Sequence, residues 1–195
     1  MIVHQIFPTV VMEFDLNSKV NSQLLYNELR QMEIKDHPLL SKNAGSSYDP
    51  GKEHLLDLEI PLIKKLKDSI QESLDVYTNE VGLLPCQISN SWMSIMNANS
   101  YLHAHRHEAS VLSGAYYPHS SADAVGLTFV SPLMPYKMCE VNEKITGYNA
   151  KEGTLQAKEG VLYLFPSWLE HRTDVNTVDN RMVISFNTLN TQPGK

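Results

Sequence analysis

Cysteine is scarce in this sequence, and it has neither a long apolar run nor a surplus of positive charge. The 195 residues include only two cysteines, which are too few for a disulfide framework. No run of about 18 apolar residues occurs, so we expect no membrane-spanning segment. Lysine and arginine number 16 against 22 aspartates and glutamates, a formal net charge of −6. This acidic balance argues against a general nucleic-acid binder, which needs surplus positive charge.

The N-terminal segment lacks the features of a secretory signal. MIVHQIFPTVVMEF has no basic start followed by a long apolar run and a small-residue cleavage site. Because the two cysteines also lack CxxC spacing, we expect reduced thiols and a cytoplasmic protein. An apolar fraction of 42% suffices for one buried core. We therefore expect one domain over residues 1–195, with an N-terminal strand and helices over 1–85 and a core over 86–195.

The first 85 residues alternate between apolar patterns and polar loops. Residues 6–14 are typical of a strand, which Pro8 restricts to a sheet edge or a strand start. We expect a helix from a cap at Asn17 or Ser18 to about Met32, and a loop over 33–53. Pro61 is well suited to the first turn of a second helix. The predicted buried stripe of that helix consists of Ile63, Leu66, Ile70, Leu74, Tyr77 and Val81.

From Cys86 onward the sequence predicts short strands separated by turns. Closely spaced strands of this kind indicate a barrel or a sandwich and not a parallel βαβ sheet. The longest irregular stretch covers residues 131–153, and a loop of that length is often a lid or a binding loop. The expected strands cover residues 87–97, 111–117, 126–130, 154–157, 161–165 and 181–189.

Three of the eight histidines lie within five residues, at His103, His105 and His107. In a strand, side chains at i and i+2 share a face, so these imidazoles can converge on one point. Imidazole nitrogen suits zinc, copper, iron and nickel. Such a cluster could also be the solvated polar end of a strand. A further histidine in a distant segment of the sequence favours the metal site over this interpretation.

That segment is GVLYLFPSWLEHRTDVNTVDNRMVISFNTL, residues 160–189. His171 follows a buried-looking strand, and ten residues later Arg181 opens a strand of clean alternation. Arg181, Val183, Ser185 and Asn187 face one way, and Met182, Ile184, Phe186 and Thr188 face the other. A guanidinium fork holds a carboxylate with two parallel hydrogen bonds. Ser185 lies on the same face as Arg181 and can add a hydroxyl to that carboxylate.

Three motifs now carry a resemblance to a known family. HRHEASVLSGAYY (105–117), EGVLYLFPSWLEHR (159–172) and RMVISFN (181–187) occur in order, and the sequence resembles the iron(II)- and 2-oxoglutarate-dependent dioxygenases over most of residues 90–189. The resemblance is to a small branch with a His-x-His motif. It implies an α+β fold, a double-stranded β-helix (jelly-roll) core with N-terminal helices packed on it.

The resemblance also implies the cofactors and the site. The family binds iron(II) and consumes O₂ and 2-oxoglutarate, and the usual product is a hydroxylated substrate. Carried over by position, His105 and His171 are metal ligands, and Arg181 pairs with the distal carboxylate of 2-oxoglutarate. Tyr117 and Ser185 match positions that hydrogen-bond the same carboxylate.

The sequence departs from the family pattern at position 107. The family norm there is a carboxylate, whereas this sequence has His107. Either His107 completes an all-histidine triad, or Glu108 supplies a carboxylate from a bend in the chain. Strand parity favours His107, because residue 108 of a strand points to the opposite face. His103 has the right parity, but its match shifts the register of the SGAYY motif.

Two other functions fit parts of the pattern. One is a cupin-like dioxygenase with three histidine ligands and no need for 2-oxoglutarate, in which Arg181 binds a substrate carboxylate. The other is a jelly roll that binds without catalysis. The substrate is not readable from the sequence, and the exposed sheet edges of jelly rolls often pair, which leaves a homodimer open.

Overall fold

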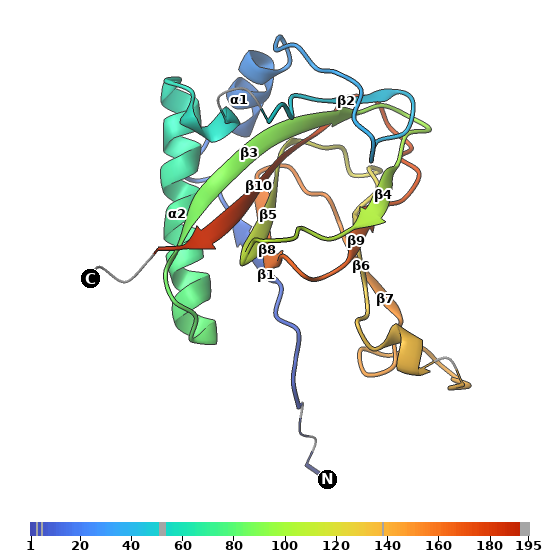
Figure 1. Ribbon diagram of the computed structural model, residues 1–195. Helices are drawn as coiled ribbons and strands as arrows, with labels where there is room; N and C mark the ends of the chain where they lie inside the picture. Colours follow the sequence, from blue (N-terminus) through green and yellow to red (C-terminus); the bar gives the residue numbers. More distant parts are fainter. Residues whose placement is uncertain (3, 5, 51–53, 138, 192–195) are drawn as a thin grey trace.

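Two antiparallel β-sheets form the body of the protein in a computed structural model that describes residues 1–2, 4, 6–50, 54–137 and 139–191. The larger sheet has the order β1-β8-β5-β10-β3-β2 and the smaller has the order β4-β9-β6-β7. Figure 1 shows the two sheets facing each other, with both helices on the outer face of the larger sheet. The expected jelly-roll core is confirmed by this architecture and by the comparisons given below.

The predicted strands of the core are confirmed with small shifts of their ends. They are β3 (Cys86–Met96), β5 (Leu112–His119), β6 (Leu127–Val130), β7 (Glu152–Leu155), β8 (Val161–Pro166) and β10 (Arg181–Asn190). Sequence reasoning assigned no boundaries to β2 (Ala44–Ser46), β4 (Leu102–His105) and β9 (His171–Thr173). Strands of three or four residues are too short for an alternation to be recognised, and β2 lies within the predicted 33–53 loop.

The N-terminal strand and the first helix differ from the expectation. The strand β1 covers Met12–Asp15, later than the predicted 6–14, and it forms an edge of the larger sheet beside β8. The helix α1 covers Ser22–Leu29, and Asn21 caps it by accepting a hydrogen bond from the Leu24 amide at 3.0 Å. The predicted caps at residues 17 and 18 were therefore wrong, because the helix begins only at Ser22 and the side chain that accepts from its third amide is Asn21.

The second helix, α2 (Pro61–Val81), begins at the predicted proline and ends at Gly82, which has a left-handed φ of 73°. A glycine reaches this conformation without a steric penalty, which explains the sharp end. The predicted stripe is buried from Ile63 to Tyr77, and Val81 is partly buried. No helix in the described part of the chain is both long and apolar enough to cross a membrane.

The larger sheet divides its side chains between two environments. On the outer face Met182, Ile184 and Phe186 of β10 pack in the same apolar cluster as α1 and α2. On the inner face Arg181, Val183, Ser185 and Asn187 line a cavity between the sheets. The predicted alternation of β10 is therefore confirmed, and it directs a charged residue into the interior.

Candidate active site

The cavity between the sheets has a volume of about 240 Å³ and holds the residues that the sequence singled out. Its floor is the inner face of β3 and β10, and its opposite wall carries the histidines of β4 and β9. No acidic side chain is among the lining residues in the described part of the chain. The cavity is therefore a place for neutral or anionic ligands.

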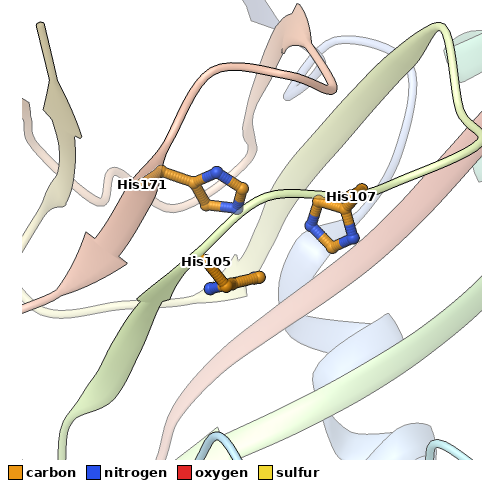
Figure 2. Close-up of side chains that lie close together, drawn as sticks. All are labelled: His105, His107 and His171. Carbon is orange, nitrogen blue, oxygen red and sulfur yellow. The ribbon is translucent and has the colours of Figure 1, made fainter. Parts of the chain in front are cut away.

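Three histidines gather at one side of the cavity. His105 ends β4, His171 begins the neighbouring β9, and the two are cross-strand partners. His107 follows β4 by two residues, and its amide donates to the Ser167 carbonyl at 3.0 Å. One ring nitrogen of each histidine lies within 4.8 Å of the others. Figure 2 shows the three imidazoles turned into one space, as a facial metal site requires.

Backbone carbonyls fix the orientation of two of these rings. The Nδ1 of His105 lies 2.8 Å from the His103 carbonyl, and the Nδ1 of His171 lies 2.9 Å from the Leu169 carbonyl. Because a carbonyl oxygen only accepts, each Nδ1 carries the proton and donates it. The Nε2 of each ring is then an unprotonated lone pair, which is the form that binds a metal.

The surroundings of the cluster keep the imidazoles neutral. Burial, together with a smaller effect of the neighbouring histidines, lowers the pKa of His171 to about 3 and that of His107 to about 4. Burial also lowers the pKa of His105. Phe165 lies edge-on to the His171 ring at 4.8 Å between centroids, so the apolar wall excludes water there. All three side chains are consequently in the ligand form at neutral pH.

The alternative ligands lie elsewhere. Glu108 is exposed to solvent and does not belong to the cluster. The His103 side chain is exposed and packs edge-on against Tyr101, and its carbonyl orients the His105 ring. The geometry therefore brings together the triad that strand parity favoured.

Arg181 is the most unusual residue of the cavity, because it is charged and only 1% exposed. Its Nε donates to the Val125 carbonyl at 3.1 Å, and its Nη1 contacts the Met96 sulfur at 3.1 Å. No carboxylate in the described part of the chain pairs with it. Burial lowers the pKa of Arg181. A buried charge without a counter-ion is costly, so this guanidinium needs an anion from outside the chain.

The two predicted hydroxyl partners of that anion differ in their distance from Arg181. The Tyr117 hydroxyl accepts from Arg181 Nη2 at 3.5 Å, and the guanidinium lies over the Tyr117 ring at 5.0 Å. Burial raises the pKa of Tyr117, so its phenol stays neutral and its proton can be donated. Ser185 lines the same cavity but makes no hydrogen bond to Arg181 among the described contacts.

Sequence reasoning missed several residues that line the cavity. His37, Leu39, Leu40 and Tyr48 line it, and they come from the segment treated as a plain polar loop. Trp92 also lines the cavity, 5.4 Å from Tyr48 and 5.9 Å from His107 between ring centroids.

The long loop over residues 131–153 was expected to be a lid or a binding loop. None of its described residues lines the cavity. Figure 1 shows this segment projecting away from the sheets beyond β6 and β7. The segment that borders the cavity is instead the one on either side of β2, with His37, Leu39 and Leu40 before that strand and Tyr48 after it. No local sequence pattern signals this role.

A protein-family model described as "Putative 2OG-Fe(II) oxygenase" matches residues 90–187, about half of the chain. The chain belongs to this family. It is therefore an iron(II)- and 2-oxoglutarate-dependent oxygenase, with iron as its metal and 2-oxoglutarate as its cosubstrate. The matched range includes all three clustered histidines and Arg181, so the observed metal-type cluster and the unpaired guanidinium fit the chemistry of the family.

Solved structures share the fold of this oxygenase. HygX from Streptomyces hygroscopicus, with nickel, 2-oxoglutarate and hygromycin B bound, has a TM-score of 0.64 at 12% identity and covers 94% of this chain and 84% of its own. The viral collagen prolyl hydroxylase vCPH from Paramecium Bursaria Chlorella virus-1 has a TM-score of 0.61 at 13% identity, with coverage of 93% and 96%. A Pseudomonas putida prolyl-4-hydroxylase has a TM-score of 0.63 at 10% identity, with 94% of each chain covered. A search of curated proteins found no significant match.

Proposed function

We propose that this oxygenase hydroxylates a C–H bond of its substrate, with iron held by His105, His107 and His171. Bound iron and 2-oxoglutarate supply the oxidant, because oxidative decarboxylation of 2-oxoglutarate to succinate and CO₂ activates O₂. The part of the protein is to bind, orient and exclude water. Among the similar structures are one with a small molecule bound and one with a peptide fragment bound, and both classes of substrate are compatible with this proposal.

The convergence of the three neutral imidazoles carries the proposal. Two of the rings are already oriented by backbone carbonyls, so little ordering remains to be done when a metal binds. Three neutral ligands also leave the full charge of a divalent ion in the cavity. That charge favours a dianionic cosubstrate more than a site with a carboxylate ligand does.

Arg181 is the second support for this function. In our proposal its guanidinium holds the distal carboxylate of 2-oxoglutarate, and the Tyr117 hydroxyl donates to the same group. Ser185 is the further partner that the sequence proposed for this carboxylate. The bound dianion then supplies the counter-ion that the buried guanidinium lacks.

The test is anaerobic loading with iron(II), followed by titration with 2-oxoglutarate and measurement of succinate after O₂ is admitted. We expect about one iron per chain in the wild type, because one facial site is present. His105→Ala and His171→Ala are expected to lose the iron and the succinate. Full iron occupancy in both variants, or iron binding without 2-oxoglutarate turnover, contradicts the proposal, and the second result favours the cupin-like alternative.

A further inference from the structure

The cavity has a second polar end that the cosubstrate does not explain. Asn90 of β3 and Asn187 of β10 are cross-strand partners, and both line the cavity. Six residues of extended strand separate Asn187 from Arg181, about 20 Å along the chain. The hydrogen bonds of the guanidinium to Met96, Val125 and Tyr117 hold it at its own end. A five-carbon diacid anchored there is too short to account for both amides.

Neighbouring hydroxyls fix which way the Asn187 amide faces. The Ser113 hydroxyl donates to Asn187 Oδ1 at 2.8 Å, and it lies 2.8 Å from the Ser167 hydroxyl. Because the single hydroxyl proton of Ser113 is donated to Asn187, the Ser167 hydroxyl must be the donor in the hydrogen bond between the two serines. Asn187 Nδ2 has no acceptor in the described part of the chain, so it remains a donor at the cavity wall.

Asn90 offers the opposite chemistry. Its Oδ1 is buried and has no hydrogen-bond donor among the described residues. An acceptor left in that state is unfavourable, and such groups in native proteins usually have a partner. Residues directly opposite each other on antiparallel strands have Cβ atoms about 5 Å apart. The two side chains therefore place one unpaired acceptor and one unpaired donor side by side.

This pair lies close to the metal triad. The amide of His107 donates to the Ser167 carbonyl at 3.0 Å. The Ser167 hydroxyl is hydrogen-bonded to Ser113, and Ser113 is hydrogen-bonded to Asn187. Trp92, two residues from Asn90 on the same strand face, lies 5.9 Å from the His107 ring. A group held between the two amides is thus next to the face of the triad that His107 forms.

Size and charge restrict what that group can be. The cavity of about 240 Å³ lies below the range of about 300–1,000 Å³ typical of pockets for drug-sized ligands. Since iron and 2-oxoglutarate also occupy it, the substrate inserts only a small group. No acidic side chain among the described lining residues could pair with a cation, and the wall at this end is aromatic, formed by His37, Tyr48 and Trp92. An anionic group without a proton to donate leaves the Asn90 Oδ1 acceptor unpaired, so the group that fits is neutral and planar.

We infer that Asn90 and Asn187 determine substrate specificity by binding a carboxamide edge, that is, an N–H donor beside a carbonyl oxygen on one planar group. Asn90 Oδ1 accepts from the N–H, and Asn187 Nδ2 donates to the carbonyl. A primary carboxamide and a lactam both present this edge. This inference rests on the proposed function, because it assigns the substrate side of the same site.

The test uses two small probes and a fluorescence readout in protein loaded anaerobically with iron(II) and 2-oxoglutarate. The sequence has two tryptophans, so Trp168→Phe leaves Trp92 as the only reporter. Propionamide represents the carboxamide and 2-pyrrolidinone the lactam. N,N-dimethylpropionamide and N-methyl-2-pyrrolidinone are the matched controls without an N–H.

The variants remove one amide at a time. Asn90→Leu and Asn187→Leu keep the size of the side chain, and Asn187→Asp keeps the hydrogen bond from Ser113. Asn27→Leu is the control at an exposed position.

We expect at least one N–H probe to bind the wild type and Asn27→Leu alike. Each variant at 90 or 187 is expected to weaken it about ten-fold, the effect of one lost hydrogen bond. The probe that binds identifies the source of the edge. Equal binding of the methylated controls, unchanged binding in the variants, or no binding by either probe overturns the inference. Weakened 2-oxoglutarate binding in these variants also overturns it, because the pair then holds the cosubstrate, whereas the proposed function stands. A wild type that binds no 2-oxoglutarate overturns both.

Discussion

Replacing Arg181 by methionine should change stability and cosubstrate binding in opposite directions. Arg181 is 1% exposed and has no carboxylate partner in the described part of the chain. Desolvating an unpaired charge costs several kcal/mol, even after the protein relaxes. Methionine fills a similar volume without the charge. The lost hydrogen bond to the Val125 carbonyl offsets about 1 kcal/mol. We expect the free energy of unfolding without 2-oxoglutarate to rise by about 1–3 kcal/mol.

The same substitution removes the group that we assign to the cosubstrate carboxylate. Truncating one partner of a buried, hydrogen-bonded charge pair costs about 2–5 kcal/mol, so the dissociation constant for 2-oxoglutarate should rise roughly 30- to 5,000-fold. Arg181→Lys should recover only part of the affinity, because an ammonium keeps the charge and loses the planar fork. Ser185→Ala should have the smaller effect of a single hydrogen bond to a charged group, about 1.5–3 kcal/mol.

The assay is urea unfolding of the anaerobic iron-loaded protein with and without 2-oxoglutarate, alongside direct titration. At a hundred times the dissociation constant, 2-oxoglutarate should stabilise the wild type by about 2.7 kcal/mol and the methionine variant hardly at all. Arg30→Met, at the exposed C-terminal cap of α1, is the matched control and should respond like the wild type. If Arg181→Met responds to 2-oxoglutarate as the wild type does, the guanidinium is not the clamp. If it is also markedly less stable, the reasoning about an unpaired charge fails as well.

Two further predictions concern the histidine cluster. His107→Ala should lose iron as His105→Ala does, whereas Glu108→Ala should keep it, because Glu108 is exposed and outside the cluster; iron analysis that gives the reverse pattern refutes the all-histidine triad. In metal-free protein, the pKa values of about 4 for His107 and about 3 for His171 lie below the ordinary 6.5, so the unfolded chain binds more protons below pH 6.5. Stability should then fall by about 2–4 kcal/mol between pH 7 and pH 5, as measured by urea unfolding, and His171→Asn should flatten this dependence; a flat profile in the wild type contradicts the assigned burial.

The local pattern of residues determined much of this protein. The 3.6-residue spacing of apolar positions after Pro61 was enough to predict α2, because one helix face is buried along its whole length. The alternation of β10 was enough to predict that Arg181 lies on the face opposite Met182 and Ile184, because a strand with one face in a core fixes the direction of every second side chain. The clustering of His105 and His107 and the distant His171 likewise gave the candidate ligands.

Only the tertiary structure decided which of these residues meet. β4 and β9 have four and three residues, and their pairing places His105 against His171, a contact set by the packing of the sheets and not by either segment alone. The loop residues His37 and Tyr48 line the cavity for the same reason. The open amides of Asn90 and Asn187 exist only once β3 pairs with β10 and Ser113 orients one of them. The local sequence pattern determines the direction in which a side chain points, whereas the residue that it contacts depends on segments far away in the chain.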